Sequence, residues 1–236
     1  MQKFLKSKRF WISLTALYVC VQIAPGVALQ VTEGRVVVAC QFSAIILACL
    51  FCAAFAEKSY AYALTQLALV CTVCADYFLV WSQPMVQLPA MAFFLCAQIA
   101  YAARLYLLAG QGERRAQLIL RISLSPLIVA VTAIVLGQST DALAVVSMLY
   151  YVQLIMNVVF AFVGFRSRAI LAIGFLLFLC CDTVIGLDMI NAYLPIPEDA
   201  LLYKIIRPGF NLAWAFYLPS QTLLSISLLP RKLKSE

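Results

Sequence analysis

The sequence predicts an all-α, polytopic membrane protein with eight transmembrane helices, and three observations lead to this class. The 236 residues are 65% hydrophobic and 11% charged, whereas about 25% of the residues of a soluble domain are charged. Apolar runs of about 20 residues, the length that crosses a hydrocarbon core, recur along the chain. Lys and Arg fall between these runs and at both termini. Because the polar groups are too few to cover a water-facing surface, we expect the chain to fold in a bilayer.

Short polar breaks, some with Gly or Pro, divide the chain into its expected spans. Glu57 and Lys58 separate the second run from the third, and basic stretches separate the fourth from the fifth (110–115) and the sixth from the seventh (166–168). The longest loop, 191–207, precedes Pro208, which suits the first turn of the last helix. The expected spans, which form one integral membrane domain over 1–236, are 10–30, 35–56, 60–81, 89–109, 118–137, 142–163, 169–190 and 208–229.

The basic residues predict which way the helices cross the membrane, because Lys and Arg are enriched in cytoplasmic loops. If both termini are cytoplasmic, all 17 Lys and Arg residues except Arg35, Lys204 and Arg207 lie on or flank the cytoplasmic side. Only an even number of spans places both basic termini on one side. We therefore expect eight spans, two cytoplasmic termini and, from the compact loops, a bacterial plasma membrane.

The composition also excludes several classes of function. The net charge is +7, but the basic residues do not gather on one face, so no nucleic-acid partner is expected. The chain has no His, which excludes Ser-His-Asp and Cys-His catalysis. All nine Cys lie in apolar runs, where Cys acts as a small packing residue. We therefore expect no disulfide, no metal site and no cofactor.

Two acidic residues, Asp76 and Asp182, lie deep inside expected spans. An ionisable group at membrane depth costs about 2.5–3.5 kcal/mol, so such residues usually have a function. Both aspartates fall in the outer half of spans that run from inside to outside, so the two carboxyls are expected to face one cavity. The alternative is that each is buried against a neighbouring helix. Both follow Cys-containing stretches four spans apart, which is compatible with two parallel four-helix halves.

Other polar side chains recur at helical spacing on spans four, six and eight, and Gln41 lies in the outer half of span two. Residues three, four or seven positions apart share one helix face, and such faces point inward because an amide in lipid lacks partners. We expect these side chains to contact the substrate, and the alternative is that they hydrogen-bond one helix to another. The candidates for substrate binding are Gln41, Gln98, Tyr101, Tyr150, Gln153, Asn157, Tyr217 and Gln221.

Four short motifs carry a family resemblance. They read ADYFL at 75–79, AQIAY at 97–101, GFLLFLCCDTVIG at 174–186 and FYLPSQ at 216–221. In this order and in these spans, the motifs resemble those of the YhhN family of eight-helix membrane lysoplasmalogenases. Three positions depart from the family pattern: Gln41-Phe42 stands where many members have Lys-Pro, Gln98 where many have His, and Cys181 where Ser is usual.

The resemblance implies hydrolysis of the vinyl ether bond of a lysoplasmalogen, which yields a fatty aldehyde and a glycerophospho-alcohol. This chemistry needs a carboxylic acid that donates a proton and a carboxylate that stabilises the resulting cation and activates water. We assign Asp182 as the acid and Asp76 as the base, with a membrane lipid as the partner. The alternative function is a small-solute or proton-coupled transporter that uses the same aspartates. A third is a lipid-binding membrane protein without catalysis. The lipid headgroup, the chain length and the oligomeric state are left open.

Overall fold

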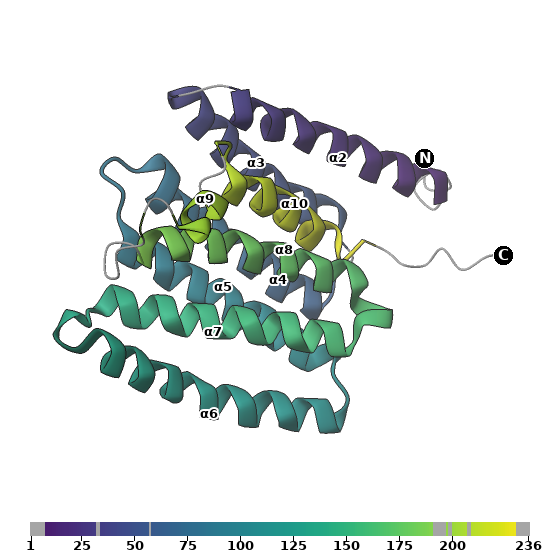
Figure 1. Cartoon of the computed structure of the whole chain (residues 1–236). Coiled ribbons are helices and arrows are strands. Elements are labelled where there is room, and N and C mark those ends of the chain that lie inside the picture. The colour runs from purple at the N-terminus through teal and green to yellow at the C-terminus, as the bar shows by residue number, and fades with distance from the viewer. Residues whose placement is uncertain are drawn as a thin grey trace.

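The computed structural model describes residues 8–31, 34–56, 58–190, 197, 200–206 and 209–229. This part of the chain is helical and contains no strand. The helices lie side by side in one bundle (Figure 1). Their bounds are α2 Lys8–Val31, α3 Arg35–Phe55, α4 Tyr60–Asp76, η1 Tyr77–Trp81, α5 Gln87–Leu108, α6 Gln111–Leu136, η2 Gly137–Ser139, α7 Ala142–Val163, α8 Phe165–Ile190, α9 Leu201–Ile206 and α10 Leu212–Ile226.

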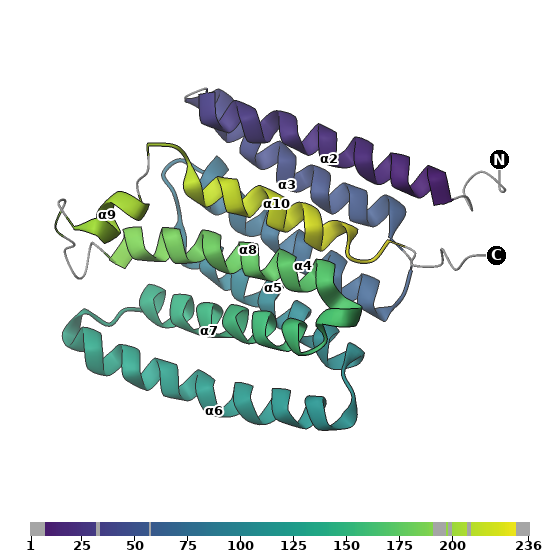
Figure 2. The same cartoon turned by 45° about the vertical axis from the view of Figure 1, so that its right-hand side comes forward.

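The long helices run alternately up and down the bundle. The start of α2 and the end of α10 lie at the same end (Figure 2), which we call the N/C end. The opposite end, where η1, α6 and α8 finish, is called the distal end. Arg114, Arg115, Arg166 and Lys58 belong to the turns or first helical residues at the N/C end. The basic residues that the sequence predicts on one side of the membrane therefore lie at one end of the bundle, the N/C end.

Seven helices of the described chain are long and apolar enough to cross a membrane. They correspond to the first seven expected spans. The eighth expected span, 208–229, contains α10, which has 15 residues and is therefore about 22 Å long, shorter than a hydrocarbon core of about 30 Å. Eight full spans are thus not confirmed. Pro208 and most of the expected loop 191–207 lie outside the described residues, although the loop's end forms the short helix α9.

Two helices begin earlier than their apolar runs. α6 starts at Gln111 instead of residue 118, and α8 starts at Phe165 instead of residue 169. Both added segments contain Arg side chains, which are good helix formers but lower the local hydropathy. Hydropathy therefore marks the lipid-embedded part of a helix and not the turn that emerges from it.

The third expected span is not a uniform α-helix. Its α-helical part, α4, ends at Asp76, and the five residues Tyr77–Trp81 continue as a π-helix. A π-helical turn is rare and is frequent at functional sites. The change of helix type places Asp76 at the junction, one step before the wider turn begins.

The C-terminal helix α10 packs centrally although it is last in sequence. It packs against α8, and also against α2 and α3. Gly174 of α8 allows the close approach, because a Cβ there would lie 3.0 Å from the side chain of Leu224. Small residues bring membrane helices together in this way. Since α10 packs on helices from both ends of the chain, the structure does not confirm two four-helix halves.

Candidate active site between α4, α7, α8 and α10

Asp76, the last residue of α4, is almost completely buried, with 2% of its surface exposed. Its Oδ2 accepts a hydrogen bond of 2.7 Å from the hydroxyl of Tyr217 on α10. Trp214 lies one turn before Tyr217 and meets its ring edge to face, with centroids 5.0 Å apart. The tyrosine is therefore held both by its ring and by its hydroxyl, and it fixes the orientation of the carboxyl.

Asp182 on α8 has the same kind of partner. Its Oδ2 accepts a short hydrogen bond from the hydroxyl of Tyr150 on α7. Tyr150 is 4% exposed, whereas Asp182 is partly exposed. Two carboxyls are thus each held by one tyrosine from a different helix. Four helices contribute one residue each to this arrangement.

A chain of aromatic rings joins the two tyrosines. Phe94 of α5 lies 5.6 Å from Tyr150 and 6.0 Å from Phe178, measured between ring centroids. Phe178 in turn lies 5.4 Å from Tyr217. Such offset and edge contacts stabilise the relative placement of rings. The rings between the two tyrosines restrain the positions of both Asp–Tyr pairs together.

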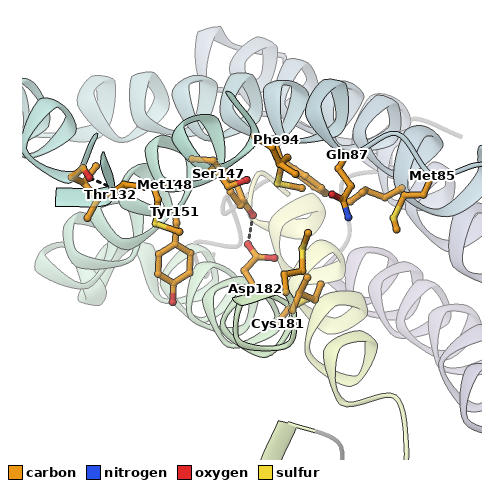
Figure 3. A pocket seen from close by; sticks show the side chains of 18 of the residues that line it. Met85, Gln87, Phe94, Thr132, Ser147, Met148, Tyr151, Cys181 and Asp182 are labelled. Atoms are coloured by element: carbon orange, nitrogen blue, oxygen red, sulfur yellow. Dashed lines mark hydrogen bonds between the residues drawn. The ribbon is translucent and has the colours of Figure 1, made fainter. Parts of the chain in front are cut away.

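Both aspartates line one cavity of about 540 Å³. The cavity lies in the distal half of the bundle, because its residues come from the ends of η1, α6 and α8 and from the first halves of α5, α7 and α10. It is elongated: Thr132 and Met148 lie toward one end, Met85 lies at the other, and Asp182 lies between them (Figure 3). The arm toward α6 is called the α6 arm and is lined by Ile128, Val131, Thr132, Val135, Leu136, Leu143 and Met148.

The walls of the cavity are mainly aliphatic and aromatic, with few polar side chains. Apart from the two Asp–Tyr pairs, these are Gln87, Thr132, Ser147, Tyr151 and the thiol of Cys181. A largely apolar pocket with a few convergent polar groups is the usual form of a binding site for a small or lipid ligand. Paired carboxyls in such a pocket can donate a proton to an apolar ligand and stabilise a cation formed on it.

The structure brings together some of the residues that the sequence singles out and not others. Asp76, Asp182, Tyr150 and Tyr217 all line the cavity. The six other candidates, none of which is among its lining residues, are Gln41, Gln98, Tyr101, Gln153, Asn157 and Gln221.

Those six side chains lie elsewhere in the bundle, and Gln41 is buried on α3. Tyr101 packs against Phe175, and Gln221 is fully buried one turn beyond Tyr217. Gln98, Gln153 and Asn157 belong to a hydrogen-bond network nearer the N/C end. The helical stripes were correct in predicting inward-facing side chains, but a stripe several turns long extends beyond a cavity that occupies half the bundle.

Several cavity residues were not predicted. Ser147 and Tyr151 occupy α7 four positions apart, on the face next to Tyr150, and Thr132 extends the lining to α6. The spacing of Ser147 and Tyr151 is a signal that could have revealed them. The hydroxyls of Tyr151 and Thr183 lie 2.8 Å apart. Thr132 carries no such signal, since its hydroxyl donates to Ile128 O on its own helix.

No group of three or more potential metal ligands occurs in the part of the chain that the structure describes. The nine cysteines all lie in described segments and are unpaired. The polar atoms that face the cavity are carboxyl, hydroxyl, amide and thiol groups. The two Asp–Tyr pairs supply the carboxyl groups among them.

The model of the YhhN family matches residues 36–228 of the chain. The match covers α3 to α10 and includes every residue of the cavity. Searches of curated proteins and of solved structures found no match to this chain.

Proposed function

The chain belongs to the YhhN family, and from this premise we propose that it is a membrane hydrolase that cleaves the vinyl ether bond of a lysoplasmalogen-type lipid. The products are a fatty aldehyde and a glycerophospho-alcohol. The observation that carries the proposal is the placement of Asp76 and Asp182 on one cavity, each held by a tyrosine.

The shape of the cavity supports a single-chain lipid as the substrate. A volume of about 540 Å³ lies within the range of small-ligand pockets, about 300–1,000 Å³. The α6 arm offers apolar walls for the aliphatic chain. Asp182 lies partway along the cavity (Figure 3), so a chain in the α6 arm places a bond near its polar end beside the carboxyls.

The proposed reaction begins with proton transfer from one carboxyl to the alkene carbon that does not bear oxygen. The alkene electrons form the new C–H bond, and the adjacent carbon becomes an oxocarbenium ion. The second carboxylate stabilises this cation and removes a proton from the attacking water. The hemiacetal then collapses to aldehyde and alcohol. Paired carboxyls serve a similar oxocarbenium-like transition state in glycoside hydrolysis. The assignment of Asp182 as the acid and Asp76 as the base remains a prediction.

The two tyrosines have a positioning role in this proposal. Each hydroxyl donates to one oxygen of an aspartate, Tyr217 to Asp76 and Tyr150 to Asp182. In this proposal the other carboxyl oxygen meets the substrate or water. Fixed geometry of this kind lowers the activation free energy, because the reacting groups need no rearrangement.

The orientation of the chain follows from its charges. We infer that the N/C end is cytoplasmic, since basic residues gather there and positive charge marks the cytoplasmic side. The cavity then lies in the outer half of the bilayer. The compact loops favour a bacterial plasma membrane as the location that we propose.

The test is aldehyde release by the purified full-length protein from a panel of single-chain lipids. We expect release from alkenyl ether lysolipids and none from saturated ether or ester lysolipids with the same headgroup. The reaction needs no gradient, so detergent-solubilised protein should be active. Absence of aldehyde from every alkenyl lipid, together with solute uptake into sealed vesicles that depends on Asp182, would instead favour the transporter.

A further inference from the structure

A second polar cluster lies outside the cavity, between α5, α6 and α7. It is centred on Arg121 of α6, whose Nη1 donates to Gln153 Oε1 at 2.5 Å and whose Nη2 donates to Asn157 Oδ1 at 2.7 Å. We call these three residues, with Gln98 and Ser125, the Arg121 cluster. None of the five lines the cavity.

The partners of Arg121 are held in place by further hydrogen bonds. The Asn157 side-chain amide donates to the backbone oxygen of Gln98 at 3.0 Å and to its Oε1 at 2.9 Å. The Gln153 amide donates to Ser125 Oγ at 2.9 Å. Both amide oxygens are therefore turned toward the guanidinium by bonds on their opposite sides. The geometry of the cation is set before any ligand arrives.

The charge of Arg121 is not neutralised by this network. Its partners are neutral amides, with the ring of Phe160 5.8 Å away. The ion pair found between described residues joins Arg168 and Glu113, at the N/C end of α6 and α8. A buried or half-buried charge is normally paired. Arg121 is partly exposed, so an anion can reach it from the bilayer side.

The unfilled hydrogen-bonding atoms of the cluster are donors. Arg121 Nε and Gln98 Nε2 are both buried without an acceptor in the described structure, and buried polar groups are rarely left unpaired. Gln98 is fully buried, so the group of the cluster that an outside ligand can meet is the partly exposed guanidinium of Arg121. A guanidinium fork is especially suited to phosphate, which it can bind through two parallel hydrogen bonds.

The depth of the cluster points to a lipid as the source of that phosphate. Arg121 is ten residues from the start of α6, which is about 15 Å along the axis, and a helical side chain leans back toward the N-terminus. Of the candidate spans that the structure describes, α6 is the least buried. A lipid of the leaflet at the N/C end can therefore approach Arg121 along α6. Arg114, seven positions earlier on the same helix face, extends the positive charge toward the headgroup region.

We propose that the Arg121 cluster is a binding site for the phosphate group of a membrane phospholipid, separate from the cavity that holds the two aspartates. The proposal does not rest on vinyl ether hydrolysis, because the site is defined by binding alone. A lipid held there would neutralise the charge of Arg121 at membrane depth.

The experiment is native mass spectrometry of the full-length protein in detergent, with phosphatidylglycerol and with diacylglycerol that has the same chains but no phosphate. For the unmodified protein we expect tighter binding of phosphatidylglycerol. Arg121→Gln should weaken that binding about tenfold or more, the effect of losing charge-assisted hydrogen bonds. Arg115→Gln is the matched control, since it removes the same charge from an exposed position of the same helix and should leave the preference unchanged.

Two further measurements identify the ligand and control for misfolding. Arg121→Lys keeps the charge but loses the fork, so it should bind phosphatidylglycerol less tightly than the unmodified protein and more tightly than Arg121→Gln. Displacement of the lipid by inorganic phosphate would identify the free ion as a sufficient ligand, and lack of displacement would identify the phosphate in its lipid context. Equal binding of phosphatidylglycerol and diacylglycerol by the unmodified protein would overturn the proposal without any variant. So would a folded Arg121→Gln protein that keeps the preference.

Discussion

The hydroxyl of Tyr217 donates a 2.7 Å hydrogen bond to Asp76, although the two residues are 141 positions apart in the chain. The bond joins the last helix, α10, to the junction between α4 and the π-helical turn η1. Because α10 also packs against α8, the position of Asp76 depends on how α10 seats against Gly174 and its neighbours. The geometry of one carboxyl is thus coupled to the docking of the C-terminal helix.

The first prediction concerns the carboxyls. Asp76→Asn and Asp182→Asn should each lower the rate of aldehyde release about 100-fold or more, the usual scale for loss of a general acid or base. The double variant should be little slower than either single one, because groups that act as a unit are not additive. Near-normal rates in either single variant, or carboxyls more than about 15 Å apart in an experimental structure, would refute a shared site.

The second prediction concerns the tyrosines. Tyr150→Phe and Tyr217→Phe remove only the hydroxyl that holds an aspartate, so kcat should fall about tenfold while KM changes little. Tyr151→Phe provides a close control, because Tyr151 also lines the cavity but its hydroxyl pairs with Thr183. Steady-state kinetics on one alkenyl lysolipid would separate the two effects. If Tyr151→Phe reduces kcat as much as the other two, the tyrosines have no special role in positioning the carboxyls.

The third prediction concerns the α6 arm. Thr132→Phe places a ring in this arm, so KM for long-chain substrates should rise about tenfold, with a smaller effect on short chains. The control is Ile134→Phe, two residues along the same helix, where the side chain is 80% exposed. A panel of alkenyl lysolipids that differ only in chain length gives the measurement. A uniform loss of activity across all lengths would show that the chain binds elsewhere.

The fourth prediction concerns the cysteines. Alkylation of the denatured protein without reductant should modify all nine thiols, and elemental analysis should find no stoichiometric zinc or iron. The reason is that the nine cysteines are unpaired and no His accompanies them. Fewer than nine modifications, restored to nine by reductant, would reveal a disulfide.

The fifth prediction concerns topology. Reporters fused beside Lys3 and after Ser235 should both report the cytoplasm, since basic residues gather at the N/C end. An external reporter at one terminus alone would mean an odd number of crossings, so the count of eight would be wrong by one.

Hydropathy located every long helix, because lipid-facing residues such as Ile134 and Leu17 are hydrophobic whatever their neighbours are. It could not judge the length of α10, because residues 208–229 remain apolar beyond the point where the helix ends. The π-helical turn after Asp76 was also not predicted, since no known spacing of side chains marks it. The local sequence pattern thus predicted where the helices lie, but not the short length of α10 or the π-helical turn.

The sequence predicted the two aspartates of the candidate site but not which other residues line the cavity. Asp76 and Asp182 stood out because each is a charged residue in an apolar run, and their matched depth predicted a shared cavity. The amides of Gln153 and Asn157 were expected to serve the same cavity, but they bind Arg121 instead. The sequence shows which face a residue occupies, whereas the partner across the interface depends on how helices are rotated against one another.

The short length of α10 determines which aqueous compartment the site can sense. A polar depression at the distal end is lined by Gln30, Asp188 and Asn211, the last of which caps α10. Tyr217 lies six residues beyond Asn211, only about 9 Å along the helix axis. Protons and water should therefore exchange with the site from the distal phase and not from the cytoplasmic one. If the chain carries out the proposed hydrolysis, its rate in sealed vesicles should respond to acidification on the distal face of the membrane and not to the same change on the other face.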